Sequence, residues 1–207
     1  MKHSRIDIMV DLETIGLGDQ YPVIQIGAIA FDLSSGSPVA APFNERVYLL
    51  SDVLVSADTL RWWVKDEGRR NTFAKILCER ADRSESSAFE AFDEWIHELA
   101  VDHCINGLNG LHLWSNGIAF DSKILKTKFE QFGLTWPIHY RNDRDMRTLL
   151  DPYLALTGQT YEEVKIKANN AVHQEEHEAL SDCQAQIWLV SQAWRTLTHI
   201  PGSCQTL

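Results

Sequence analysis

The chain has 207 residues, of which 44% are hydrophobic and 23% are charged, within the range of one compact globular domain. With 19 basic against 29 acidic residues the formal net charge is −10, which argues against tight, sequence-independent binding to long duplexes. The apolar runs are far shorter than the roughly 20 residues needed to cross a bilayer, and no secretory leader is evident. We therefore expect a single cytoplasmic domain over residues 1–207, without a membrane span.

The four cysteines are scattered along the chain and include no Cys-x-x-Cys pair. Zinc sites and secreted disulfide frameworks need closer and more regular spacing. We expect reduced thiols at Cys78, Cys104, Cys183 and Cys204.

Segments rich in isoleucine and valine predict an opening group of strands. The first two span residues 6–12 and 23–33, and a turn that contains glycine lies between them at 14–20. Residues 45–50 are a third candidate strand, after a loop that contains serine, glycine and proline. We expect the three strands to form an antiparallel meander.

From Ser56 onward, apolar residues recur at helical spacing. Ser86 or Ser87 is the predicted cap of the last helix in this region, with Glu90 as the capping-box partner of Ser87. The residues that set the spacing are Leu60, Trp63, Val64, Phe73, Ile76, Leu77, Phe89, Phe92, Ile96 and Leu99.

Strand and helix then alternate as in a parallel βαβ unit. A fourth strand is predicted at residues 111–115, and the helix predicted at 119–132 has one apolar stripe. A final helix is predicted at 178–197. Since no internal repeat or low-complexity linker is present, these patterns predict one α/β domain.

Asp11 and Glu13 stand two residues apart at the end of the first predicted strand. Strand alternation puts both carboxylates on one face, where their charges repel each other. Oxygen ligands of this kind favour Mg²⁺ or Mn²⁺. The alternative is a solvated strand end with two incidental acids, and the pair alone does not decide between these interpretations.

Asp121 falls at the start of the helix that follows the fourth predicted strand. The helix dipole and free backbone N–H groups favour a carboxylate there, so an ordinary helix-start acid is one interpretation. The junction also lies at the C-terminal edge of a strand, where α/β sheets usually bind ligands. This position favours a functional acid.

His177 and Asp182 are five residues apart, which corresponds to about 140° of rotation on a helix. They therefore cannot share one helix face. The spacing favours His177 in the loop before the helix, as a general base, and Asp182 in its second turn, as a metal ligand. His173, one turn upstream, is the alternative base.

Adjacent tryptophans at Trp62 and Trp63 point about 100° apart on a helix, so one is expected in the core and the other outward. The outward ring could stack on a base, although both rings could equally be core residues. Basic residues are candidates for phosphate contacts, but a solvated helix face is expected for the three lysines. These residues are Arg141, Arg144, Arg147, Lys123, Lys126 and Lys128. Asp145 is expected to cap the helix that follows it.

Three segments together resemble the exonuclease motifs of the DnaQ-like superfamily, in the same order. They are residues 10–14 (VDLET), 116–121 (NGIAFD) and 177–182 (HEALSD), and the His-x₄-Asp spacing resembles its DEDDh branch. Residues 59–63 (TLRWW) and 144–148 (RDMRT) look most similar to its small phage-type and mycobacterial exoribonuclease-like subgroup. The resemblance covers residues 6–194.

This resemblance implies an RNase H-like fold and two bound divalent cations, Mg²⁺ or Mn²⁺. Asp11 would bridge both cations, Glu13 and Asp182 would complete one site, and Asp121 would hold the second. His177 would generate the attacking hydroxide at the 3′ end of a single-stranded nucleic acid, releasing nucleoside 5′-monophosphates.

The resemblance also implies where the substrate lies. The backbone at Leu12 and Thr14 and the side chain of Glu13 would contact the terminal nucleotide, with Phe120 wedged near its base. Asn116, in the second motif, is a further candidate for substrate contact.

The sequence thus predicts a metal-dependent 3′-to-5′ exonuclease on single-stranded ends, with RNA slightly favoured over DNA. A phage-type DNA exonuclease, an internal nuclease of the same fold and a non-catalytic nucleic-acid-binding domain are the alternatives. A homo-oligomer is compatible with the sequence.

Overall fold

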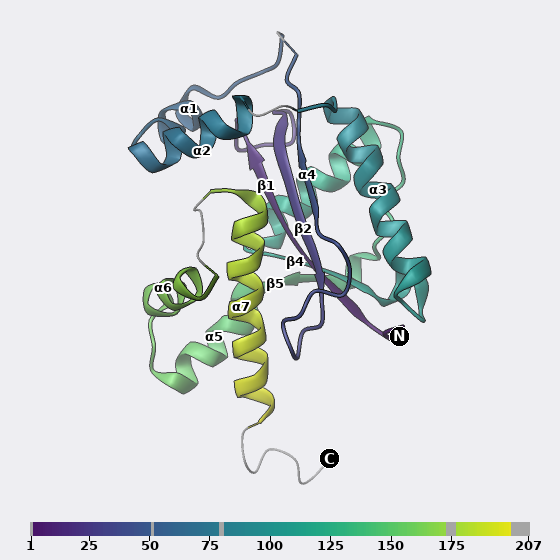
Figure 1. Ribbon diagram of the computed structural model, residues 1–207, viewed down its shortest axis with the longest axis vertical. Coiled ribbons are helices and arrows are strands. Elements are labelled where there is room, and N and C mark those ends of the chain that lie inside the picture. Colours follow the sequence, from purple (N-terminus) through teal and green to yellow (C-terminus); the bar gives the residue numbers. More distant parts are fainter. Residues whose placement is uncertain (1, 51, 79–80, 173–176, 200–207) are drawn as a thin grey trace.

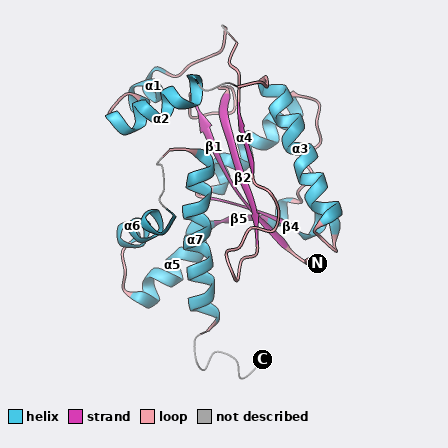
Figure 2. Cartoon of the chain, viewed as in Figure 1, coloured by secondary structure: helices cyan, strands magenta, loops and turns pink. Residues whose placement is uncertain are grey.

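The computed structural model describes residues 2–50, 52–78, 81–172 and 177–199. It has a five-stranded sheet in the order β3-β2-β1-β4-β5, flanked by helices on both faces (Figure 1, Figure 2). The strands are β1 (Ile6–Thr14), β2 (Val23–Phe31), β3 (Phe43–Arg46), β4 (Leu111–Ser115) and β5 (Asp143–Asp145). The helices are α1 (Ala57–Trp63), α2 (Glu67–Cys78), α3 (Glu85–Asp102), α4 (Ile118–Gln131), α5 (Met146–Thr157), α6 (Tyr161–Val172) and α7 (Ala179–Thr198).

The sheet is mixed, as the strand pattern predicts. β1, β2 and β3 pair antiparallel, whereas β4 runs parallel to β1 and β5 runs parallel to β4. Every residue of β2 is buried, which explains its nearly continuous apolar sequence, since strands covered on both faces lose polar alternation.

The two larger apolar cores lie on opposite faces of the sheet. One joins the sheet to α3 and α4 through residues such as Phe89, Phe92 and Phe129. The other joins it to α5, α6 and α7 through residues such as Met9 and Val190. None of the described helices is both long and apolar enough to cross a membrane.

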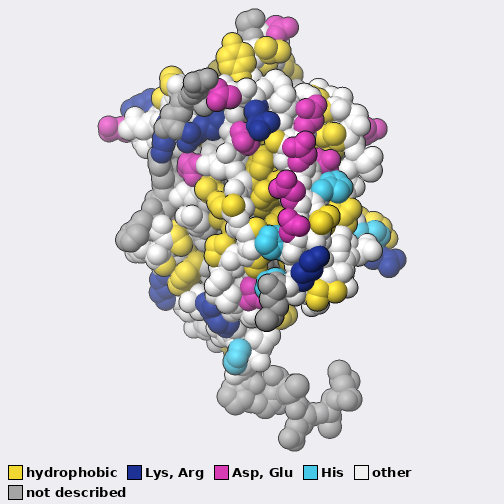
Figure 3. All heavy atoms as spheres, turned by 45° about the vertical axis from the view of Figure 1, so that its right-hand side comes forward, with side chains coloured by type: hydrophobic (Ala, Val, Ile, Leu, Met, Phe, Trp, Pro, Cys, Tyr) yellow, Lys and Arg dark blue, Asp and Glu magenta, His cyan; other side chains and the backbone are white. Residues whose placement is uncertain are grey.

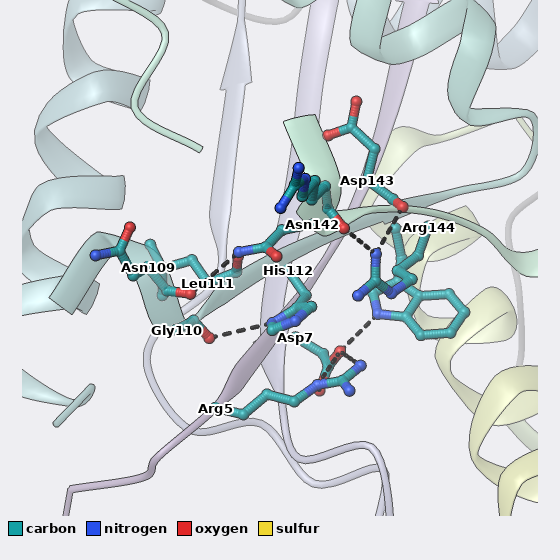
Figure 4. A network of polar contacts seen from close by, with 11 residues as sticks. Arg5, Asp7, Asn109, Gly110, Leu111, His112, Asn142, Asp143 and Arg144 are labelled. Atoms are coloured by element: carbon teal, nitrogen blue, oxygen red, sulfur yellow. Dashed lines mark hydrogen bonds and ion pairs between the residues drawn. The ribbon is translucent and has the colours of Figure 1, made fainter. Parts of the chain in front are cut away.

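A polar network fixes β1 against β4 near the start of β1 (Figure 4). The buried carboxylate of Asp7 accepts hydrogen bonds from Arg5 Nε at 2.9 Å and from Trp114 Nε1 at 2.6 Å. Asn142, just before β5, donates to the carbonyl oxygen of Leu111 at 2.9 Å. These contacts lie at the opposite end of β1 from Asp11 and Glu13.

The third strand lies earlier than predicted, at Phe43–Arg46 instead of 45–50. Val47 N still donates to Ile24 O on β2 at 2.9 Å, and Val47 also forms a β-bridge with Arg83. The chain then follows Arg83, whose carbonyl oxygen accepts a hydrogen bond from Tyr48 N at 2.7 Å. The cap of α3 is Ser84, which accepts a hydrogen bond from Ser87 N, so the predicted caps at Ser86 and Ser87 were wrong.

One expectation about an exposed helix residue also needs correction. Lys128 is buried, with Nζ 2.8 Å from Glu85 Oε1 at the start of α3, because this face of α4 packs toward α3 instead of solvent. Leu60 and Leu77 lie in helices, as their spacing predicts, and Val64 is the C-cap of α1, although all three side chains are exposed.

Candidate active site

The end of β1 places Asp11 and Glu13 beside β2. In the strand register Asp11 pairs with Gly27 and Glu13 pairs with Gln25, and the register shifts between Glu13 and Thr14. Positions two apart on a strand share a face, so this regular register agrees with the prediction that both carboxylates lie on one face of β1. Glu13 is buried.

Gly27 lets α7 approach the sheet at this point. A Cβ atom there would lie 2.5 Å from the carbonyl carbon of Ala179 and 2.6 Å from the backbone nitrogen of Leu180. The first turn of α7, which carries Asp182, therefore rests directly against the strand position that pairs with Asp11. Figure 1 shows this end of α7 near the C-terminal end of β1, below α1 and α2.

Glu178 fixes the start of α7. Its Oε2 accepts a hydrogen bond from Ser181 N at 2.9 Å, and its Oε1 accepts one from Gln25 Nε2 at 2.5 Å. Asn44 Nδ2 on β3 also donates to Oε1, at 3.4 Å. The helix that carries Asp182 is therefore tied to both β2 and β3.

Glu13, His177 and Asp182 form a compact cluster. One potential ligand atom from each lies within 4.8 Å of the others. His177 has a left-handed backbone, with φ of 62°, and precedes the helix cap at Glu178. The structure thus confirms that His177 lies off the helix of Asp182, although Asp182 occupies the first turn, not the predicted second turn, because the helix begins at Ala179.

Asp121 joins this acidic region from the first turn of α4. Gly117 at the helix cap has φ of 108°, a conformation that favours glycine, and Asp121 is buried four residues later. The predicted placement of an acid at this strand-to-helix junction is therefore confirmed.

Burial and mutual repulsion raise the pKa values of these acids. Burial is the main cause for all three: it raises the pKa of Asp11 to about 6, and that of Asp121 to about 8 with the Asp11 charge adding to it. The pKa of Glu13 also rises well above its usual range, through burial and the nearby charge of Asp11. Carboxylates crowded in this way, with a histidine beside them, suit hard divalent cations.

The two tryptophans separate as predicted. Trp63 is 1% exposed, and its Nε1 donates to the carbonyl oxygen of Thr14 at 3.0 Å. Trp62 is 38% exposed and meets the His177 ring edge-on, with centroids 4.7 Å apart. The guanidinium group of Arg69 lies over the Trp62 ring, with its central carbon 4.5 Å from the ring centroid.

The family model described as the 3′-5′ exoribonuclease Rv2179c-like domain matches residues 6–194. The chain belongs to this family. The enzyme is accordingly a 3′-to-5′ exonuclease, a hydrolytic nuclease, as the three motifs predict.

The chain is also similar to a phage protein and to several solved structures. An exodeoxyribonuclease of Enterobacteria phage T4 is 24% identical over 216 residues, covering 91% of this chain and 89% of that protein. The zinc-bound complex of E. coli ExoI with single-stranded DNA has a TM-score of 0.68 at 13% identity, covering 95% of this chain and 42% of that one. Cell-death related nuclease 4 (CRN-4) has a TM-score of 0.63 at 14% identity, covering 92% of this chain and 64% of that one. The chain therefore spans less than half of the length of the ExoI chain. These structural likenesses establish that the chain has an RNase H-like fold.

A cleft of about 610 Å³ opens beside the acidic cluster of this exonuclease. Of the residues predicted to contact substrate, those that line it are Leu12, Glu13, Thr14, Trp62, Trp63 and Phe120. Asn116 is exposed and does not line the cleft.

Sequence reasoning missed other residues of the cleft. Leu17 is 83% exposed in the loop after β1, and it lines the cleft with Gln20 and Tyr21. Asp58 and Thr59 line it from α1. The only signal for Leu17 was an apolar residue in a glycine-containing turn, which is too common to assign a role.

Most of the basic residues considered for phosphate contacts form ion pairs with acidic side chains of the protein. Arg147 Nη2 lies 2.6 Å from Asp145 Oδ2, and Lys126 Nζ lies 2.6 Å from Asp143 Oδ2. Asp145 also caps α5, accepting a hydrogen bond from Arg147 N, as predicted.

Cys78, Cys104 and Cys183 are free thiols. The alternative base His173 and the fourth cysteine, Cys204, lie outside the described residues.

Proposed function

We propose that this exonuclease removes nucleoside 5′-monophosphates from the 3′ ends of single-stranded RNA, using two Mg²⁺ or Mn²⁺ ions. The observation that carries the proposal is the cluster of Glu13, His177 and Asp182, whose ligand atoms lie within 4.8 Å of one another. Glu13 also lines the cleft of about 610 Å³, so the reacting phosphodiester can meet this cluster.

Asp11, Glu13, Asp121 and Asp182 would hold the cations. The raised pKa values of Asp11 and Asp121 support this assignment, because nearby positive charge would stabilise the ionised carboxylates against the burial and the neighbouring negative charge that raise these values. When bound, the cations would stabilise both the attacking and the leaving oxygens of an in-line displacement.

His177 would take the proton of the attacking water. Its place off α7 lets the ring reach the same space as Glu13 and Asp182. Trp62 and Trp63 meet the imidazole edge-on and limit its movement. As water attacks phosphorus, the bond to the 3′ oxygen of the preceding nucleotide breaks, and that oxygen takes up a proton.

The cleft would bind the terminal nucleotide. Leu12 and Thr14 line the cleft at the end of β1, while Trp62 and Phe120 present exposed aromatic surface for base stacking. The cleft volume of about 610 Å³ falls in the range of small-ligand pockets and suits one end of a strand more than a duplex.

The acidic surface supports local contact of this kind. Acidic side chains gather in a column on the face that Figure 3 turns forward, on the α3 side of the molecule. Together with a formal net charge of −10, this column would repel a phosphate backbone outside the cleft. A single-stranded end is therefore the substrate that this enzyme can engage with least repulsion.

RNA is favoured because the family is described by exoribonuclease activity. The second candidate is single-stranded DNA, because the phage T4 relative is an exodeoxyribonuclease. The proposed site would act on either sugar, so the two candidates differ only in substrate.

A time course on 5′-labelled single-stranded RNA and DNA of one sequence, with Mg²⁺, Mn²⁺ or chelator, tests the proposal. We expect a ladder that shortens from the 3′ end, faster for RNA, and that disappears with chelator. Faster loss of DNA would favour the second candidate, and oligomeric products would contradict exonuclease action.

Variants test the assigned roles. Asp182→Ala should abolish activity, whereas Asp151→Ala, an exposed acid on α5, should leave it unchanged. His177→Ala should lower turnover by roughly 10²-fold or more, the loss typical of a missing general base. His173→Ala should have a much smaller effect, and equal losses would reject His177 as the base.

A further inference from the structure

Gln186 is a buried polar residue next to the acidic cluster. It lies on α7 one helical turn after Asp182, so the two side chains share a helix face. Gln186 is 8% exposed, and its Nε2 donates to Asp11 Oδ1 at 3.1 Å. It lies four residues beyond the third exonuclease motif, which ends at Asp182.

The other end of the Gln186 amide has no partner. Its Oε1 is buried without a hydrogen bond among the described residues. A buried carbonyl oxygen without a donor destabilises the folded protein, so an apolar side chain of similar size would suit stability alone better. What glutamine offers at this position is the N–H group that reaches Asp11.

The chemistry of this donor suits a carboxylate that must also bind cations. The amide is neutral, so it can hold Asp11 without the positive charge by which a lysine or arginine would compete with a cation. A glutamate in its place would add a negative charge beside Asp11 and Glu13. The hydrogen bond occupies Oδ1 and restricts rotation of the carboxylate, and it makes no demand on Oδ2.

We propose that Gln186 is a positioning residue that orients the Asp11 carboxylate for cation binding before a cation arrives. This inference rests on the proposed function, in which Asp11 helps to hold the cations. Partners that orient metal-binding side chains typically change metal affinity by about 10–100-fold when they are removed. The contact therefore predicts a measurable change in cation affinity.

Gln186→Met tests this role, because methionine keeps the length and flexibility of glutamine but lacks the amide. Gln186→Leu provides a second variant, and Gln184→Met, at an exposed position of α7, is the matched control. The measurement is the melting temperature of substrate-free protein at increasing Mn²⁺ concentration. For both Gln186 variants we expect the Mn²⁺ midpoint to rise about 10-fold or more, with the control unchanged.

Two further readouts separate positioning from structural support. Without metal, Gln186→Met should melt at or above the wild-type temperature, because it removes an unpaired carbonyl. Its turnover should fall at limiting Mn²⁺ and recover at saturating Mn²⁺. An unchanged Mn²⁺ midpoint overturns the inference, whether or not the metal-free melting temperature falls.

Asp182→Ala in the same titration distinguishes this inference from the proposed function. If Asp182→Ala shifts the midpoint and the Gln186 variants do not, only the role of Gln186 is rejected. If Asp182→Ala also keeps the wild-type midpoint, the proposed cation site itself is rejected.

Discussion

Trp62 and Trp63 are neighbours on α1 that meet different surroundings, so their replacement should separate binding from stability. Trp63→Ala should lower the free energy of unfolding by about 3–5 kcal/mol, because it removes a large buried ring. Trp62→Ala should change stability little but weaken binding of a single-stranded oligonucleotide by about 1–3 kcal/mol if a base stacks there. Urea unfolding and oligonucleotide titration measure the two quantities.

Leu77→Ala on α2 serves as the control, because this exposed side chain lies outside the cleft. It should leave oligonucleotide binding at the wild-type level. Wild-type binding by Trp62→Ala would assign Trp62 to packing against His177, Trp63 and Arg69 instead of substrate binding.

Single residues could be predicted from sequence where spacing alone constrains them. Strand alternation predicts that Asp11 and Glu13 share one face of β1, and helix geometry predicts that His177 lies before the helix that carries Asp182. The contacts that Glu178 and Gln186 make with the sheet could not be found in this way, because Gln25 and Asp11 lie more than a hundred residues away in sequence. A pattern along the chain does not specify which distant strand a helix will touch.

At the scale of elements, Gly27 controls how closely α7 approaches β2. Gly27→Ala should lower the free energy of unfolding by about 1–3 kcal/mol, a typical cost of overpacking, and should also reduce turnover. The reason is that the new Cβ would lie 2.5 Å from the backbone of Ala179, so the turn that carries Asp182 must move. Urea unfolding and steady-state kinetics on RNA measure both effects.

Gly68→Ala is the matched control, because a Cβ there meets only Asp66 Oδ1 at an ordinary 3.5 Å, within helix α2. Alanine also favours helix over glycine, so this variant should be as stable as wild type or more stable. Wild-type turnover in Gly27→Ala would mean that the helix can shift without disturbing the site.

Elements with strong apolar patterns could be predicted, and polar ones could not. β1, β2, β4 and the long helix α7 follow from runs or stripes of apolar residues. β5 is the short polar sequence Asp143–Asp145, which becomes a strand only because β4 offers a free edge. Such pairing depends on tertiary contact more than on local preference.

For the whole molecule, the acidic cluster couples stability to pH and metal. The folded pKa values of Asp11 and Asp121 are raised to about 6 and about 8, so the folded protein holds these protons more tightly than the unfolded chain does. The associated stability is fully present below the ordinary pKa of an aspartate, about 4, and is lost as pH rises through the raised values. Divalent cations should offset this loss, because they favour the ionised carboxylates.

Melting temperatures of the chelator-treated protein between pH 5 and 9 should therefore fall by several degrees, since each lost kcal/mol lowers the melting temperature by roughly 2–4 °C at this size. Mn²⁺ should raise the melting temperature more at pH 8.5 than at pH 5.5. The lowered pKa values of Asp19, Asp32 and Asp66 affect stability only below this range, because these carboxylates are ionised throughout it. Tighter proton binding by the folded protein requires both the fall in melting temperature with pH and the larger Mn²⁺ effect at pH 8.5. A metal-free melting temperature that does not change with pH would therefore show that the acidic cluster does not hold its protons in the folded state. An equal Mn²⁺ effect at both pH values would show the same.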